Sequence, residues 1–214
     1  MPLVLPRLYV ILDAALAEAP VEQLAENLFA AGVRLFQYRD KRASGGELLR
    51  NARTLAERLV PWGATFLVND RPDVAYLAGA SGVHVGQDDV RAEDARAVIG
   101  ASRLVGVSTH NRAQFEGALK TSADYLAVGP IFATGSKENP DPVVGTALLK
   151  ELRGLTERPI VAIGGITLER AGEVMEAGAD SAAVISDILR SADPAMRARE
   201  FLRVLEGFQS RAAS

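Results

Sequence analysis

Short apolar segments alternate along the whole chain with longer amphipathic stretches. The short segments are nearly continuous hydrophobic runs, rich in β-branched and aromatic residues, as expected for parallel strands covered by helices. They comprise residues 8–12, 34–38, 65–69, 82–85, 103–108, 125–128, 160–163 and 181–185. The stretches between and after them have the hydrophobic spacing of amphipathic helices. These comprise residues 21–31, 47–59, 92–99, 112–120, 147–152, 168–177 and 194–208.

This alternation predicts a single α/β domain over residues 1–214, because no Gly/Ser-rich linker, charge block or shift in composition divides the chain. Strands joined by right-handed helical crossovers close naturally into a (β/α)₈ barrel. A doubly wound open sheet is the alternative, but no G-x-G-x-x-G motif follows the first apolar run. We therefore predict a TIM barrel, whose active site lies at the carboxyl ends of its strands.

The first apolar stretch, residues 3–12, has two interpretations. It is interrupted by Pro6 and Arg7 and is too short to span a bilayer. A secretory signal peptide is one interpretation, and a first buried strand is the other. We favour the strand.

Composition and charge narrow the class of protein. Hydrophobic residues make up 48% of the 214 residues and charged residues 24%, as in globular domains. The absence of cysteine excludes disulfides and thiolate metal sites and fits a reducing cytoplasm. A net charge of −3 argues against nucleic acid as the main partner. We expect a cytoplasmic protein that acts on small molecules without a membrane or nucleic-acid partner, and the sequence is compatible with a homo-oligomer.

Polar side chains follow the second predicted strand, where a barrel has its active site. Because side chains alternate along a strand, Gln37, Arg39 and Lys41 share one side. Two cations and an amide donor suit a polyanion such as diphosphate. The alternative is a solvated strand end with surface ion pairs.

Acidic residues follow the third and fourth predicted strands. Asp70 either ligates a metal or caps the helix that Pro72 is expected to begin. Asp89 is either a ligand or a helix-start charge. Because the two lie at neighbouring strand ends, we favour a Mg²⁺ site, in which one or two carboxylates act together with substrate phosphates.

The fifth predicted strand ends in Ser108, and His110 follows it. The Ser108 hydroxyl is expected to face the barrel mouth and to orient or bind substrate. No G-x-S-x-G elbow is present, so a hydrolase nucleophile is not expected. His110 suggests a general base, but a surface or capping position beside Asn111 is the interpretation we favour.

Two later loops suit a second anion. The irregular stretch 129–145 carries Thr134, Gly135, Ser136 and Lys137 and is longer than a simple turn, which is typical of a functional loop. Loops after the seventh and eighth strands of such barrels commonly bind a monophosphate. Gly165 would permit close approach there, although glycines that only form a tight turn are the alternative.

Together these segments resemble the thiamine phosphate synthase family. They match its order and spacing across nearly the whole chain, and comprise residues 37–41, 69–70, 86–89, 107–108, 129–137, 164–167 and 185–186. The resemblance implies a barrel transferase that uses Mg²⁺. The enzyme would join hydroxymethylpyrimidine diphosphate to hydroxyethylthiazole phosphate, forming thiamine phosphate and releasing diphosphate.

The resemblance also implies residue roles. The pyrimidine diphosphate would contact Gln37, Arg39, Lys41, Asn69, Ser108 and Lys137, of which Arg39, Lys41, Ser108 and Lys137 would be catalytic. The thiazole phosphate would contact Thr134, Ser136, Gly165, Ile185 and Ser186. Tyr38, Asp40 and Gly135 would also bind substrate. Asp70 and Asp89 would hold the metal.

The expected chemistry needs no general base, which suits a chain with only two histidines. An aminopyrimidine stabilises positive charge on its methylene group, so diphosphate loss followed by capture by the thiazole nitrogen is plausible. Two alternatives stay open. One is a related thiazole tautomerase, with His110 as its proton carrier. The other is a non-catalytic binder of thiamine precursors. Both are disfavoured by the presence of the metal and diphosphate residues.

Overall fold

Parallel strands and helices alternate in the computed structural model of the chain, which describes residues 3–135 and 141–208. The strands are β1 (Leu8–Asp13), β2 (Leu35–Arg39), β3 (Thr65–Asn69), β4 (Gly82–Val85), β5 (Leu104–Thr109), β6 (Tyr125–Val128), β7 (Ile160–Ile163) and β8 (Ser181–Val184). The helices are α1 (Val21–Ala30), α2 (Gly45–Leu59), α3 (Pro72–Ala78), α4 (Ala92–Ile99), α5 (Arg112–Ala118), α6 (Gly145–Arg153), the 3₁₀ helix η1 (Leu168–Arg170), α7 (Ala171–Glu176), α8 (Ser186–Leu189) and α9 (Pro194–Glu206).

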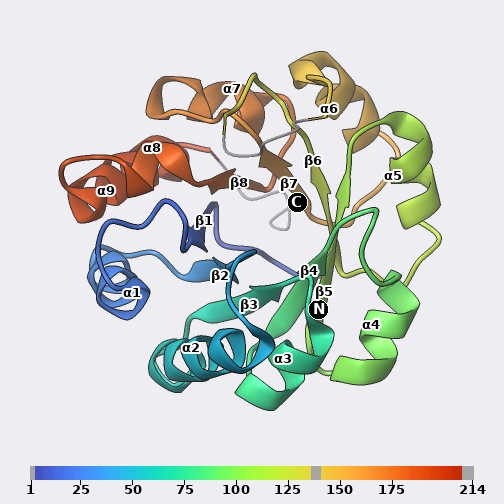
Figure 1. Cartoon of the computed structure of the whole chain (residues 1–214). Helices are drawn as coiled ribbons and strands as arrows, with labels where there is room; N and C mark the ends of the chain where they lie inside the picture. Colours follow the sequence, from blue (N-terminus) through green and yellow to red (C-terminus); the bar gives the residue numbers. More distant parts are fainter. Residues whose placement is uncertain (1–2, 136–140, 209–214) are drawn as a thin grey trace.

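The strands close into a barrel in sequence order, from β1 to β8 and back to β1. Tyr9 of β1 is in register with Leu35 of β2 on one side and with Ala183 of β8 on the other. The helices form a ring around this barrel (Figure 1). The predicted (β/α)₈ architecture is therefore confirmed.

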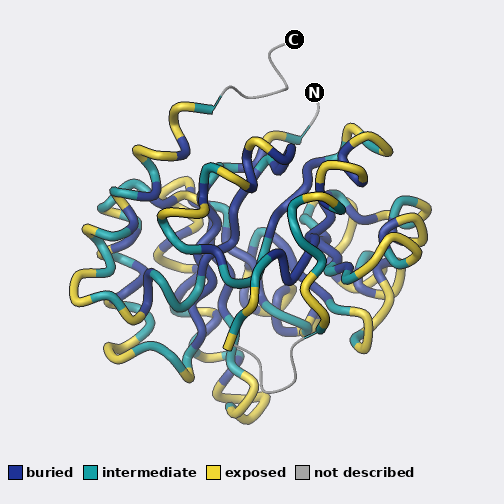
Figure 2. Tube along the Cα trace, turned by 90° about the horizontal axis from the view of Figure 1, so that it is seen from above, coloured by how far each residue is buried: buried dark blue, intermediate teal, exposed yellow. Residues whose placement is uncertain are grey.

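Alternate residues of most strands pack into two separate cores. In β1, Leu8, Val10 and Leu12 face the surrounding helices and belong to the larger core. Tyr9 and Ile11 face the barrel interior and belong to a smaller core. Figure 2 shows the buried strands in the middle of the molecule and the exposed residues on the outer turns. The inward-facing positions near the carboxyl ends are the ones available to build a site.

All the predicted strands are present, with ends shifted by one residue at several positions. β2 and β5 begin one residue late, at Leu35 and Leu104, and β8 ends at Val184. The short helix α8 was not predicted, because its four residues carry no periodic pattern. α3 begins at Pro72, as expected.

The first apolar stretch forms a strand, which confirms the interpretation that we favoured for it. Among the helices of residues 3–135 and 141–208, none is long and apolar enough to cross a membrane.

Candidate active site

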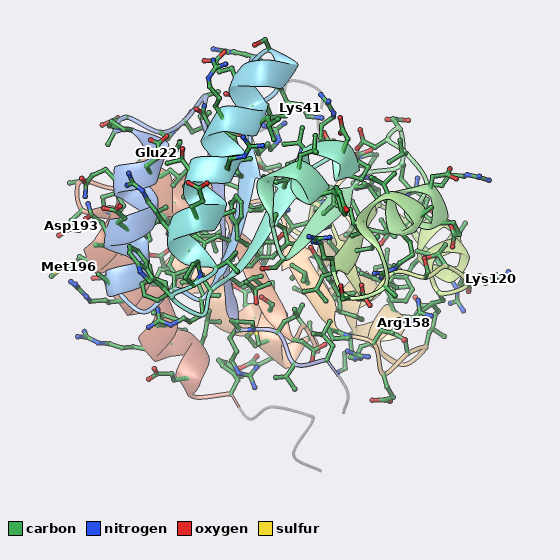
Figure 3. The ribbon with its side chains drawn as sticks, turned by 90° about the horizontal axis from the view of Figure 1, so that it is seen from below. Glu22, Lys41, Lys120, Arg158, Asp193 and Met196 are labelled. Carbon is green, nitrogen blue, oxygen red and sulfur yellow. The ribbon has the colours of Figure 1, made fainter. Side chains whose placement is uncertain are left out.

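A cavity of about 390 Å³ opens at the carboxyl ends of the strands. Its lining includes a large part of the predicted site: Gln37, Arg39, Lys41, Asn69, Asp70, Asp89, Ser108, Thr134 and Ile185. In Figure 3, Lys41 lies beside the start of α2 at one end of the barrel, whereas Arg158, which precedes β7, lies towards the other end. The barrel thus gathers at one end residues that are far apart in the sequence.

Tyr38 and Asp40, which belong to the predicted site segment 37–41, do not line the cavity. The Tyr38 phenol accepts a hydrogen bond from Asn51 of α2 at 3.0 Å, and burial raises its pKa to about 12. Asp40 accepts hydrogen bonds from the backbone N–H groups of Arg42 and Ala43, at 2.9 and 3.0 Å. Both side chains organise the loop between β2 and α2.

The predicted second anion site is only partly in the cavity lining. Thr134 and Ile185 line the cavity, but Gly135, Gly165 and Ser186 are not among the lining residues. Ser136 and Lys137 lie outside the described residues.

Gly165 has a clear packing role. Its φ is +65°, and a Cβ there would lie 2.4 Å from the carbonyl oxygen of Ala133. The neighbouring Gly164 accepts a hydrogen bond from the N–H of Phe132 at 3.0 Å. The two glycines therefore let the loop after β7 pack against the loop after β6, and Gly164 also lines the cavity.

The two cations of the cavity are each paired with a carboxylate. Arg39 forms an ion pair with Asp13, which ends β1 and is almost fully buried. Lys41 forms an ion pair with Asp70, and the Lys41 side chain is 54% exposed. Asp13 was not predicted as a site residue, although its pairing fixes the direction of the Arg39 guanidinium.

Asp70 has an unusual backbone conformation. Its φ is +62°, in the left-handed region that non-glycine residues seldom adopt and that is enriched at functional sites. It does not cap α3, since Arg71 occupies that position. Its carboxylate instead lines the cavity and contacts Lys41 and Asp89.

Asp89 faces Asp70 across the same part of the cavity. It accepts a hydrogen bond from the N–H of Gly86 at 2.8 Å and does not cap α4, which begins after Arg91. Burial and the hydrogen bond with Asp70 raise the pKa of Asp89. Within the described part of the chain, no cluster of three or more His, Cys, Asp or Glu residues is arranged as a metal site. Two close carboxylates are nevertheless a donor set that fits Mg²⁺ when a substrate supplies further oxygens.

His110 lies in the cavity lining, so the surface or capping position that we favoured for it is wrong. Asn111, and not His110, caps α5 by accepting from the N–H of Gln114. His110 Nδ1 lies 2.6 Å from the carbonyl oxygen of Gly129, and Nε2 lies 3.5 Å from an Asp141 carboxylate oxygen. Because a carbonyl only accepts, Nδ1 carries a proton and donates it to this bond.

A hydrogen-bond network that the sequence did not reveal crosses the barrel interior and, through all its members except Tyr125, forms part of the cavity lining. We call it the interior network; it joins the side chains of Gln37, Tyr9, Tyr125, His84 and Ser108, in that order. Gln37 Nε2 donates to the Tyr9 hydroxyl at 2.7 Å, and the two tyrosine hydroxyls are 3.2 Å apart. The Tyr125 hydroxyl lies 2.9 Å from His84 Nδ1, and His84 Nε2 lies 2.8 Å from Ser108 Oγ.

The sequence and fold of the chain resemble those of known proteins. The family described as thiamine monophosphate synthase matches residues 8–188. The chain belongs to this family. A thiamine-phosphate synthase of Koribacter versatilis is 53% identical over 206 residues, which cover 94% of this chain and 96% of the relative. A thiamine-phosphate synthase of Agrobacterium fabrum is 41% identical over 206 residues and covers 94% of each chain.

A solved structure has the same fold as this chain. The thiamine phosphate pyrophosphorylase from Pyrococcus furiosus superposes with a TM-score of 0.84 and 32% sequence identity, over 94% of this chain and 96% of that chain. Family membership therefore agrees with the resemblance inferred from the sequence segments.

Proposed function

We propose that the chain is a thiamine phosphate synthase, a transferase that joins hydroxymethylpyrimidine diphosphate to hydroxyethylthiazole phosphate. The observation that carries the proposal is the presence in one cavity of two cations, Arg39 and Lys41, and two carboxylates, Asp70 and Asp89. Cations suit the diphosphate, and carboxylates would hold a hard metal ion that acts together with it. The names of the two relatives, which are similar over nearly their full length, support the same reaction.

The metal in this proposal is Mg²⁺, held by Asp70 and Asp89. When bound, Mg²⁺ neutralises charge on the diphosphate oxygens and makes diphosphate a better leaving group. Arg39 would contribute a guanidinium, whose planar shape matches two phosphate oxygens at once. The ion pair with Asp13 fixes the direction of this group. Lys41, on an exposed and flexible stem, would supply a point charge that moves from Asp70 to the diphosphate.

The proposed reaction breaks the bond between the pyrimidine methylene carbon and the diphosphate oxygen, and the electron pair leaves with the diphosphate. Arg39 and Lys41 would stabilise this developing charge, which is electrostatic catalysis. The lone pair of the thiazole nitrogen then forms the new C–N bond. No proton is removed in either step. Ser108 and Gln37 would hold the pyrimidine, and the barrel would hold the thiazole nitrogen close to the methylene carbon.

The thiazole phosphate is assigned to the other side of the cavity. Thr134 and Ile185, which line it, support that assignment. Ser136, Gly165 and Ser186 remain part of this assignment through the family resemblance. Lys137 remains a proposed contact to the pyrimidine diphosphate, and Gly135 a proposed substrate contact, on the same ground. We further propose that the enzyme acts in the cytoplasm on small molecules alone, as a monomer or a homo-oligomer.

The purified protein, incubated with both precursors and Mg²⁺, tests the proposal. We expect equal amounts of thiamine phosphate and diphosphate, and no product when a chelator removes the metal. Asp70→Asn and Arg39→Ala are expected to lower turnover by about 100-fold or more, as when a charge-stabilising group is lost. The matched control is Asp73→Asn, which removes an exposed carboxylate of α3 that is paired with Arg71 outside the cavity.

Two results would overturn the proposal. Binding of the precursors without diphosphate release would identify a non-catalytic binder. Isomerisation of a thiazole precursor without coupling to the pyrimidine would identify a tautomerase, and His110 in the cavity lining keeps that alternative worth testing.

A further inference from the structure

The donor and acceptor of each hydrogen bond in the interior network follow from the number of protons that its members carry. Its tyrosines are almost completely buried, and burial raises the pKa of Tyr9 and of Tyr125 above the ordinary value. Both phenols are therefore protonated, and each has one proton to donate. The hydrogen bonds can be followed from Gln37, whose Nε2 donates to the Tyr9 hydroxyl in the structure.

Proton counting then determines the rest of the network. Tyr9 accepts from Gln37 Nε2, so its own proton goes to the Tyr125 oxygen. Tyr125 in turn donates to His84 Nδ1. Because Nδ1 accepts this bond and carries no proton, the ring proton of His84 is on Nε2 and is donated to Ser108 Oγ. The hydroxyl hydrogen of Ser108 is left to point into the cavity.

The two ends of the network thus offer a ligand one hydrogen-bond acceptor and one hydrogen-bond donor. Gln37 gives one of its two amide N–H groups to Tyr9 and keeps its amide oxygen as an acceptor, and Ser108 offers its hydroxyl proton as a donor. Both residues line the cavity. Rotating the Gln37 amide would reverse every bond, shift the His84 proton to Nδ1 and turn Ser108 into an acceptor. In both arrangements the network leaves a donor at one end and an acceptor oxygen at the other.

A 4-aminopyrimidine matches this pattern, because its amino group donates and its ring nitrogen opposite the amino-bearing carbon accepts. A 4-oxopyrimidine keeps that ring acceptor but replaces the amino donor with a carbonyl, so it needs donors at both ends. We propose that Tyr9, Tyr125 and His84 are positioning residues that couple Gln37 to Ser108 and thereby make the site select a 4-aminopyrimidine over a 4-oxopyrimidine. This inference rests on the proposed function, which puts the pyrimidine between these two ends.

Room for the network is built into the barrel. Gly106 of β5 is in register with His84 of β4 and with Tyr125 of β6. A Cβ at Gly106 would lie 2.1 Å from Tyr125 Cζ and 2.5 Å from His84 Nδ1. Glycine weakens a strand interior and is typical of a place where other groups approach closely. Here the groups that approach are the two that form the central hydrogen bond of the network.

The proton positions are tested on the wild-type protein by ¹⁵N NMR of its imidazole groups. The chain has only two histidines, and they are expected to be opposite tautomers. In untagged protein at alkaline pH, we expect His84 to carry its proton on Nε2 and His110 to carry it on Nδ1, since Nδ1 of His110 faces the carbonyl of Gly129. A proton on Nδ1 of His84 would overturn the direction assigned to the network.

The selectivity is tested with Tyr125→Phe and Tyr9→Phe, each of which removes one hydroxyl and breaks the coupling. The dissociation constants of the 4-amino and 4-oxo pyrimidine diphosphates are measured with Mg²⁺ and without the thiazole substrate. We expect the ratio of the two constants to fall by about 10- to 100-fold in each variant, the range of coupling between groups in one network. In the double variant the second substitution should add little, because the coupling is already broken.

Thr109→Val is the matched control. Thr109 lies beside Ser108 on β5, is 1% exposed, and donates to the carbonyl of Ala127 at 2.9 Å, outside the network. This variant loses a buried hydrogen bond but should keep the wild-type ratio. If the wild-type protein forms thiamine phosphate but the ratio of dissociation constants is unchanged in both folded tyrosine variants, the inference is wrong. Failure of the wild-type protein to form thiamine phosphate would instead overturn the proposed function, and the NMR measurement would still test the network.

Discussion

His84 and Tyr125 form a 2.9 Å hydrogen bond across an intervening strand, over the bare Cα of Gly106. Gly106→Ala would force these two rings apart, because the added methyl carbon would lie within 2.5 Å of atoms of both. We expect the free energy of unfolding to fall by about 1–3 kcal/mol, as in other overpacked cores. Chemical denaturation measures this change, and the imidazole signals of His84 should report the broken bond.

Gly117→Ala is the control for that substitution. Gly117 lies within α5, and no atom lies within 4 Å of the position its Cβ would take. Alanine there should be neutral or stabilise the protein by up to about 1 kcal/mol through helix propensity. Equal destabilisation of both variants would mean that Gly106 has no special packing role.

Asp13→Asn is expected to impair the enzyme through Arg39. The amide keeps an acceptor for the N–H of Ala15, at 3.0 Å in the wild type, but it loses the charge that holds the guanidinium in one direction. We expect kcat/KM for the pyrimidine diphosphate to fall about tenfold and the free energy of unfolding to fall by about 1–3 kcal/mol. The stability loss should be smaller than that for a fully buried pair, because the Arg39 side chain is 20% exposed.

Glu26→Gln removes another Arg–carboxylate ion pair, between Arg58 and Glu26 on the outer helices. It should leave kcat/KM unchanged. A rise of kcat/KM in Asp13→Asn would mean that Asp13 competes with the diphosphate for Arg39, which is the opposite of a positioning role.

Lys41→Gln should have opposite effects on metal binding and on turnover. Lys41 neutralises part of the charge of Asp70, so its removal leaves the two carboxylates more negative. Without substrate, we expect Mg²⁺ to bind about two- to fivefold more tightly, a range typical of exposed ion pairs. Turnover should fall by about 100-fold, because the diphosphate loses a cation. Calorimetric titration with Mg²⁺ and a product assay measure the two effects.

Lys120→Gln is the control, since Lys120 is exposed on the flank of the barrel, well away from Lys41 (Figure 3). If Lys41→Gln binds Mg²⁺ more weakly than wild type, the metal does not share Asp70 with Lys41.

His110→Asn separates a structural from a chemical role of the cavity histidine. The asparagine amide can donate to the carbonyl of Gly129, as His110 Nδ1 does, but it cannot carry a proton in catalysis. Since the proposed coupling reaction transfers no proton, we expect turnover to stay within about threefold of wild type. A loss of more than about 100-fold would indicate proton transfer through His110 and would favour the tautomerase alternative.

The strands could be predicted from the sequence because each is a hydrophobic run bounded by polar or turn residues. The strand ends were harder, since they depend on tertiary contacts. β1 extends one residue beyond its predicted end to Asp13, a poor strand former, whose charge is balanced by Arg39 of β2. The carboxylates at neighbouring strand ends could be predicted as a pair because the barrel topology alone brings them together.

The interior network could not be predicted, because its contacts join residues that the sequence separates widely. The two tyrosine hydroxyls that meet are 116 positions apart, and each tyrosine sits in a run that looks like an ordinary apolar strand. Two signals were available: an inward-facing histidine in β4 and a glycine in the middle of β5. Read together, they indicate a crowded polar interior, but they do not identify its partners.

The interior network also limits how relatives of this enzyme can be recombined. Tyr9 and Gln37 come from β1 and β2, whereas His84, Ser108 and Tyr125 come from β4, β5 and β6. A chimera that joins one parent's residues up to β3 to another parent's residues from β4 onward divides the network at the contact between the two tyrosine hydroxyls. Such chimeras should remain selective only when both parents supply a hydroxyl at that junction. This single contact therefore constrains which halves can be exchanged, even though the strands on both sides pair through backbone atoms that any sequence provides.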